Sequence, residues 1–197
     1  MKRIAAFTAL ALLPLAACSS GQEEPGATAS ATQEAVAGEA PSSQAPPADT
    51  ATQDAQVLGL EGLGDLKIGQ PLPKGSSWAV RGAQESDSCT TVSSPDYPGA
   101  YAIVTQGKVR RITLGANSTV KLAEGIGVGA SEADVKRWFA GFREEPHKYE
   151  AAPAKYLTAP NARPGESALR FEIGSDGKVG MIHVGEMPVL AYVEGCA

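Results

Sequence analysis

The chain has 197 residues, a formal net charge of −5 and three cysteines. The charge is unevenly distributed: residues 1–17 carry +2 and residues 18–56 carry −6, which leaves about −1 for residues 57–197. A near-neutral domain lacks the basic surface that nucleic-acid binding requires, so we exclude that class of partner. Roughly 140 residues suffice for one domain with its own hydrophobic core.

The N-terminus has the layout of a secretory signal peptide. Lys2 and Arg3 precede an apolar run over residues 4–15, and small residues follow. This is the usual order of a charged region, a short apolar region and a cleavage site. The run of about 12 residues is too short to cross a hydrocarbon core, which needs about 20. We therefore expect residues 1–17 to be removed.

The cleavage site itself is Leu15-Ala16-Ala17-Cys18, which resembles the lipobox of bacterial lipoproteins. The resemblance implies that Cys18 is diacylated, becomes the new N-terminus and is acylated again. Several acyl chains anchor a protein stably, whereas one does not. Ser19 follows, where an Asp would imply retention away from the outer membrane. We expect an outer-membrane lipoprotein facing the periplasm; the alternative is an ordinary signal peptide with a chance cysteine.

The next segment, residues 19–56, has the composition of a tether. It contains no aromatic residue, no Lys or Arg, and one branched aliphatic side chain, Val36. Such a segment cannot bury enough apolar surface to offset the entropy lost on ordering, so we expect disorder. As a flexible coil it would reach roughly 35 Å on average.

Two cysteines remain, Cys89 and Cys196. An even pair in an oxidising compartment predicts a disulfide, which would close a loop of roughly 107 residues and restrict the unfolded chain. The two histidines, His147 and His183, show no metal-ligand spacing with each other or with the cysteines. We expect neither a metal nor a cofactor.

An internal repeat runs through residues 57–197. Two pairs of matching residues lie 60 positions apart, and a longer matching motif lies 70 positions apart, in the same order. This pattern predicts two tandem copies, about 57–118 and about 119–197. The matches are Ile68-Gly69 with Val128-Gly129, Trp78 with Trp138, and Gly107-Lys108-Val109 with Gly177-Lys178-Val179.

The second copy shows its elements more clearly. Ser131 and Asp134 form a capping box, and Val135, Trp138, Phe139 and Phe142 follow at helical spacing up to Pro146. A short strand is expected at 156–158. Alternation over 169–173 predicts a half-buried strand, Asp176-Gly177 predicts a hairpin turn, and the chain returns over 179–184. A last strand is expected at 189–193.

The first copy keeps the strands over 101–105 and 109–114, with Gln106-Gly107 at their turn. Pro71, Pro73 and Gly75 stand where the second copy has its helix, so that helix is expected to be short or absent. The fold class that follows is α+β: two tandem repeats, each a short helical element packed on an antiparallel sheet, after the tether.

The second copy resembles the repeats of the β-lactamase inhibitory protein and of the small lipoprotein of the outer-membrane β-barrel assembly machine. The residues that carry this resemblance are 126–135, Pro146, Tyr149 and the 168–184 hairpin. It implies a helical element on an antiparallel sheet, with the other face of the sheet open for protein binding. Members of the class bind different partners, so the function does not follow from the fold.

Alternation also indicates which side chains point away from the core. Because Leu169, Phe171 and Ile173 face inward, their neighbours face outward, and the same reasoning applies to the adjoining strands. Arginine, tyrosine and histidine are enriched in protein interfaces. The candidate protein-binding face consists of Arg111, Arg170, Glu172, His183 and Tyr192; an ordinary solvated face is the alternative.

No sequence motif of a hydrolase, nucleotide-binding protein, metalloprotease or dithiol enzyme is present. A thiol enzyme would need Cys89 as nucleophile and His147 or His183 as base, but the disulfide is the preferred interpretation. We therefore expect a membrane-anchored, non-catalytic module that binds another envelope protein in an assembly or structural role. An inhibitor of a periplasmic or exogenous enzyme is the first alternative, and a small periplasmic hydrolase or thiol enzyme is the second.

Overall fold

The computed structural model describes residues 56–82 and 88–196. The signal peptide, Cys18 and the tether up to residue 55 lie outside the described residues. The elements in chain order are β1 (Leu58–Gly59), β2 (Gly62–Leu63), β3 (Leu66–Lys67), β4 (Ala79–Val80), β5 (Cys89–Ser93), β6 (Ala100–Thr105), β7 (Lys108–Leu114), α2 (Glu132–Trp138), β8 (Arg143–Pro146), β9 (Lys155–Thr158), β10 (Ser167–Ile173), β11 (Val179–Glu186) and the 3-10 turn η1 (Val189–Ala191).

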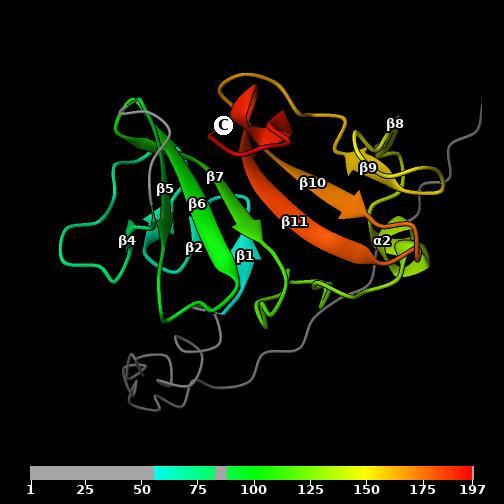
Figure 1. The fold of residues 1–197 in the computed structure, drawn as a ribbon, viewed down its shortest axis with the longest axis horizontal. Helices are drawn as coiled ribbons and strands as arrows, with labels where there is room; N and C mark the ends of the chain where they lie inside the picture. The colour runs from blue at the N-terminus through cyan, green and yellow to red at the C-terminus, as the bar shows by residue number, and fades with distance from the viewer. Residues whose placement is uncertain (1–55, 83–87, 197) are drawn as a thin grey trace, which may run out of the picture. The chain divides into compact units, whose positions relative to one another are not determined.

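One large antiparallel sheet dominates the described residues (Figure 1). Its eight strands lie in the order β4-β5-β6-β7-β11-β10-β9-β8, and β1, β2 and β3 form a separate three-stranded sheet. From either edge of the large sheet, four strands follow one another in chain order. Each half of the domain is therefore a meander, and the two meanders meet at the β7–β11 pair.

The predicted α+β class with two helix-and-sheet repeats is wrong. Within the described residues α2 is the single α-helix, and it lies in the second half. It begins as expected: the Ser131 hydroxyl accepts a hydrogen bond from the Asp134 amide at 3.1 Å and donates one to the Asp134 carboxylate at 2.6 Å. The first half has no helix here because Gly75, which corresponds to Val135, has a positive φ, and because Pro73 disfavours helical backbone at the residue before it.

The two halves nevertheless share one set of backbone contacts. In the first half, Gly69 donates to the carbonyl of Val109 at 2.7 Å, and Val109 donates back to Gln70 at 2.8 Å. In the second half, Gly129 donates to Val179 at 2.8 Å, and Val179 donates back to Ala130 at 2.9 Å. Both glycines have positive φ, which a residue with a side chain rarely adopts.

The strand assignments at the two hairpins are confirmed. Strands β6, β7, β9, β10 and β11 cover the predicted stretches, and the turns carry positive φ at Gln106, Gly107 and Gly177. Leu169, Phe171 and Ile173 face the core, as their alternation predicts. The small sheet and α2 contribute to the same core through Leu58, Leu63, Leu66 and Val135.

Three local expectations are wrong. The expected strand at 189–193 is the 3-10 turn η1. Trp138 does not join the apolar face of α2, since its side chain is 58% exposed. The helix ends at Trp138 and not just before Pro146, and Arg143–Pro146 form the unforeseen strand β8. No helix in the described part of the chain is both long and apolar enough to span a membrane.

The β7–β11 junction gives a first prediction. Gly185 lies opposite Arg111, and a Cβ atom placed on Gly185 would lie 2.2 Å from the carbonyl oxygen of Arg110. Gly185→Ala should therefore lower the free energy of unfolding by about 1–3 kcal/mol through overpacking, measured by urea denaturation.

The control is Gly180→Ala in the same strand, where the nearest atom to an added Cβ is the Glu172 carbonyl oxygen at 3.8 Å. Equal stability of the two variants would contradict the close approach of β7 and β11.

Candidate functional site

The candidate face lies on the side of the sheet away from the core, but it is not an open surface. Arg111, His183 and Arg170 are 1%, 2% and 7% exposed. The C-terminal segment lies against this face, so the resemblance-based expectation of an open face is not met. Tyr192 belongs to that covering segment rather than to a strand.

A continuous chain of polar contacts runs through this layer. The Thr113 hydroxyl lies 2.9 Å from His183 Nδ1, and His183 Nε2 lies 3.0 Å from Glu172 Oε1. The other carboxylate oxygen of Glu172 lies 3.6 Å from His147 Nε2. Because the Tyr149 and Glu150 amides donate to His147 Nδ1, the proton of neutral His147 is on Nε2, facing Glu172.

The ionisation of this chain follows from its burial. Burial lowers the pKa of His183 from 6.5 to about 4, against the opposing effect of Glu172. Burial alone would raise the pKa of Glu172, but the hydrogen bond from His183 and the nearby histidine charges outweigh it and lower the pKa. At neutral pH we therefore assign a carboxylate to Glu172 and a neutral ring to His183.

A hydroxyl, an imidazole and a carboxylate in line is an arrangement that enzymes use to activate a nucleophile. Thr113, however, has no accessible surface, so a substrate cannot reach its hydroxyl in this structure. The contacts instead satisfy the polar atoms of a buried layer, as hydrogen bonds in a protein interior must.

Arg170 extends the layer toward the sheet edge. Its guanidinium donates to Glu145 Oε2 at 2.8 Å and to the Thr158 hydroxyl at 3.0 Å, and it lies 4.1 Å from the centre of the Tyr156 ring. The other neighbour of Tyr156 is His147, with ring centres 4.7 Å apart. Removing Arg170 would leave this network incomplete, so its first role is structural.

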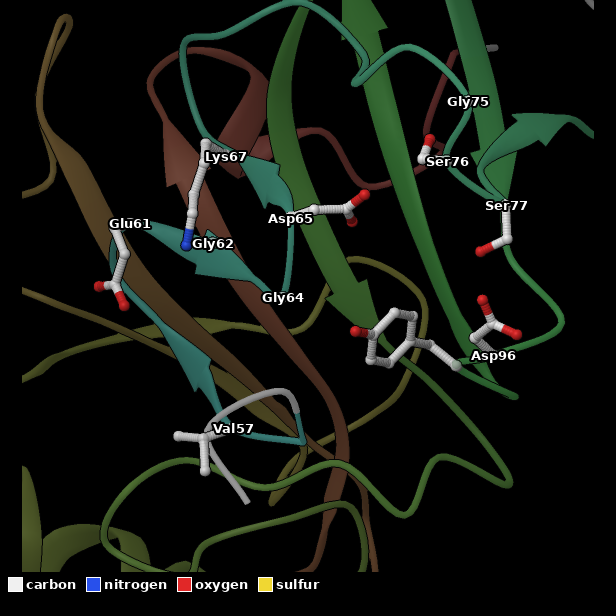
Figure 2. Close-up of a pocket in the computed structure, with 11 residues that line it drawn as sticks. Val57, Glu61, Gly62, Gly64, Asp65, Lys67, Gly75, Ser76, Ser77 and Asp96 are labelled. Carbon is white, nitrogen blue, oxygen red and sulfur yellow. The ribbon is translucent and has the colours of Figure 1, made fainter. Parts of the chain in front are cut away.

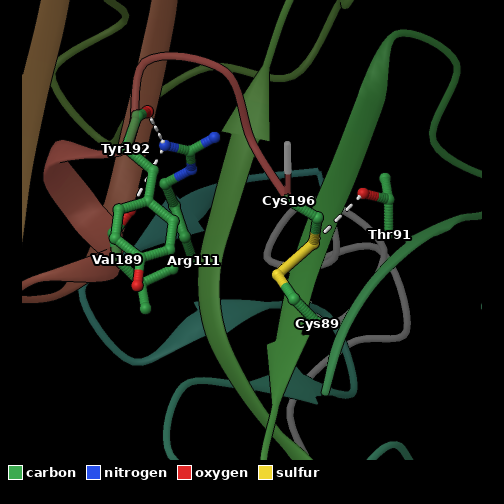
Figure 3. The surroundings of a disulfide bond; sticks show 6 residues. All are labelled: Cys89, Thr91, Arg111, Val189, Tyr192 and Cys196. Carbon is green, nitrogen blue, oxygen red and sulfur yellow. Dashed lines mark hydrogen bonds between the residues drawn. A yellow bond between two sulfur atoms is a disulfide. The ribbon is translucent and has the colours of Figure 1, made fainter. Parts of the chain in front are cut away.

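The disulfide prediction is confirmed, since Cys89 and Cys196 are bonded with a Cα–Cα distance of 5.5 Å (Figure 3). Cys89 is consequently not a free nucleophile here. The Thr91 hydroxyl donates to the Cys196 sulfur at 3.7 Å. On the other side of the segment, Arg111 donates to the carbonyl of Val189 at 3.2 Å and also to that of Tyr192.

Two further cavities lie beside the β1–β2 hairpin. One is an apolar pocket of about 300 Å³ between this hairpin, the end of α2 and the large sheet. Its mouth includes Leu60, whose side chain is 48% exposed, and its walls reach core residues such as Leu169 and Val184.

The second feature is a polar cavity of about 980 Å³ on the other side of the hairpin (Figure 2). Asp65 and Lys67 come from the small sheet, whereas Ser76, Ser77 and Asp96 lie across the cavity. Burial and the carboxylates of Asp65 and Asp96 raise the pKa of Tyr97. Three carboxylates (Glu61, Asp65 and Asp96) and one ammonium group (Lys67) line the cavity, so it is net acidic. Within the described part of the chain, none of these charged side chains forms an ion pair.

The polar cavity occupies the side on which the halves differ most. Residues 131–138 form α2 and its cap, whereas the corresponding residues 71–78 form a loop whose Gly75, Ser76 and Ser77 line the cavity. Sequence reasoning foresaw the absent helix but not the cavity. The usable signal was the glycine-rich stretch 59–69, which folds into the opposite wall.

Among the described residues, no three His, Cys, Asp or Glu side chains are grouped in a way that could hold a metal ion. The carboxylate of Glu172 lies between two histidines, but it is hydrogen-bonded to His183 and lies 3.6 Å from His147 Nε2.

Comparisons with known proteins add little. No protein-family model matches the chain, and no curated protein matches it. A solved structure of a DUF4309 family protein, YjgB from Bacillus subtilis strain 168, is similar over 60% of this chain and 70% of its own, with 10% identity and a TM-score of 0.31. A likeness this weak carries no argument about fold or function.

The buried histidine gives a second prediction. Its pKa is lower in the folded chain than in the unfolded chain, so the unfolded state binds more protons between pH 6.5 and about 4. The free energy of unfolding should have its full value above pH 6.5 and should fall by roughly 3 kcal/mol as the pH drops to about 4.

The measurement is urea denaturation at several pH values for the wild type and His183→Gln. The variant should lack most of this slope. A wild-type stability that is flat from pH 6.5 to 4.5 would contradict the assignment of a buried neutral ring.

Proposed function

We propose that the protein is a lipid-anchored module of the bacterial envelope that acts by binding another envelope protein, without catalysis. The observation that carries the proposal is the pair of pockets beside the β1–β2 hairpin, one apolar and one acidic. Leu60 lies at the apolar pocket, and its neighbour Glu61 lines the acidic cavity. We call this combined surface the hairpin surface.

The chemistry of the hairpin surface defines its partner. A pocket of about 300 Å³ is large enough for an apolar side chain or two, and such buried anchors supply most of the binding energy of protein interfaces. The adjacent carboxylates favour a partner that carries basic residues beside its apolar anchor, because charge complementarity sets orientation and association rate. The partner is therefore a protein with an exposed apolar side chain flanked by Lys or Arg.

The membrane anchor is supported by the N-terminal sequence. Residues 15–18 resemble a lipobox, and the following acidic segment has the composition of a flexible spacer. A spacer of this reach would let the domain search for a partner near the membrane while keeping its local concentration high. An outer-membrane location facing the periplasm follows from the residue after Cys18 as part of the same proposal.

The absence of catalysis is supported by the state of the two reactive groups. The sulfur of Cys89 is bonded to that of Cys196, and the hydroxyl beside His183 is buried. An inhibitor of another enzyme would use the same hairpin surface. A pull-down from detergent-solubilised envelopes captures the partner, and the identity of the captured protein decides between inhibition and an assembly role.

A third prediction tests the anchor. Cys18→Ala should prevent lipidation and cleavage before residue 18, and it should release the protein from the membrane fraction. Labelling cells with a radioactive fatty acid should mark the wild type alone. Fatty-acid label retained by the mutant would show that the anchor is elsewhere or absent.

A fourth prediction tests the hairpin surface. Leu60→Ala removes the exposed apolar side chain and should weaken binding of the captured partner by about 1–2 kcal/mol, roughly tenfold in Kd. The double variant D65N/D96N should weaken binding most at low salt. At high salt, screening already reduces the attraction between these two carboxylates and a basic partner. Isothermal titration at two salt concentrations separates the two effects.

Matched controls are Val80→Ala, an exposed apolar residue on β4, and Glu166→Gln, an exposed carboxylate paired with Arg163. Both should bind as the wild type does. Unchanged binding by Leu60→Ala and D65N/D96N, with both variants folded, would remove the hairpin surface from the proposal.

A further inference from the structure

The C-terminal residues 192–196, which we call the strap, cross the polar face of the sheet above a cavity of about 420 Å³. Val193, Glu194 and Cys196 line this cavity from the strap, while Glu172 and His183 line it from the sheet. A strap that spans a cavity makes fewer packing contacts than a close-packed segment, so its own packing holds it weakly.

The noncovalent attachments of the strap are few. Arg111 donates to the carbonyl of Tyr192 at its beginning, and the Thr91 hydroxyl donates to the Cys196 sulfur at 3.7 Å (Figure 3). Between these two points, Lys148 pairs with Glu194 at 2.9 Å. Both members of that ion pair are about half exposed, and exposed pairs contribute little. Within the described residues, no backbone–backbone hydrogen bond holds residues 193–196.

The Cys89–Cys196 bond is therefore the main restraint on the distal end of the strap. Both cysteines are partly exposed. Cys196 lines the cavity beneath the strap, and Cys89 lines a separate cavity of about 540 Å³ that also contains Tyr192. A small dithiol or the active site of a thiol–disulfide exchange protein can thus approach the bond from solvent-filled space.

We propose that this disulfide is a redox-controlled restraint: its reduction releases the strap and opens the cavity over Glu172 and His183, while the rest of the domain stays folded. A dithiol supplies two electrons and two protons. Its thiolate attacks one sulfur of the bond, its second thiol resolves the mixed disulfide, and the products are two protein thiols and the oxidised reductant.

Release of the strap would change the polar face in two ways. Water would reach His183, whose pKa is lowered mainly by burial, so its pKa should move from about 4 toward the ordinary 6.5. Arg111 would lose the carbonyl of Tyr192 as an acceptor and keep that of Val189, which lies in the buried turn η1. A closed layer with a neutral histidine would become an accessible layer with a titrating histidine.

The experiment is NMR on the full soluble chain carrying Cys18→Ala, oxidised and after treatment with dithiothreitol and alkylation of the freed thiols. Reduction should lower the 15N order parameters of residues 193–196 from rigid values near 0.85 to below about 0.6. Those of β6, β7, β10 and β11 should not change, and the His183 ring should titrate at least one pH unit higher. Cys196→Ser should reproduce the reduced state without reductant.

The control variant is Glu194→Gln in the oxidised protein, which removes the ion pair with Lys148 and should leave the strap rigid. A mobile strap in this variant would show that the ion pair, and not the disulfide, is the restraint. A strap that stays rigid after reduction would overturn the proposal. Loss of strand signals together with those of the strap would also overturn it, because the bond would then be a requirement of the whole fold.

Discussion

The antiparallel pairing of β7 with β11 is the constraint on which the structure depends. Each four-stranded meander presents an unpaired edge unless it meets another strand, and the β7–β11 pair closes both inner edges at once. The register places Ile112 opposite Val184 on the core side and Thr113 opposite His183 on the other side. The apolar core and the buried polar layer are thus two consequences of one register.

Much of the strand pattern could be predicted because it depends on local information. The alternation at Leu169, Phe171 and Ile173 identified the core side, and Gly107 and Gly177 marked turns that need positive φ. The cap at Ser131 likewise depends on residues three positions apart. The extent of the helix was less predictable, because Phe139 and Phe142 pack beside Phe171 without continuing helical backbone.

The burial of the polar face could not be predicted from alternation. Period-two patterning indicates that Arg111 and His183 point away from the core, but it cannot indicate what lies above them. The covering segment follows β11 through the turn η1 and is attached to β5, more than 100 residues earlier in the chain. Only the disulfide pairing, which the cysteine count made predictable, contained information about that long-range contact.

The proposed hairpin surface follows from the way the two halves differ. In both halves, backbone hydrogen bonds join a glycine to a valine of the hairpin, Gly69 to Val109 and Gly129 to Val179. Changing either residue would disturb the sheet. The corresponding residues 71–78 and 131–138, which come next, fold differently in the two halves. In the second half they fold as a capped helix that covers the core, and Trp138 remains at its exposed end. In the first half they cannot form a helix. Trp78 turns inward to stack on Tyr97 with ring centres 5.6 Å apart, and the small sheet covers the core instead.

The small sheet leaves an acidic cavity on one side of its first hairpin and an apolar pocket against α2 on the other. The proposed hairpin surface therefore lies where the two halves differ, and the strand geometry that they share holds it in place.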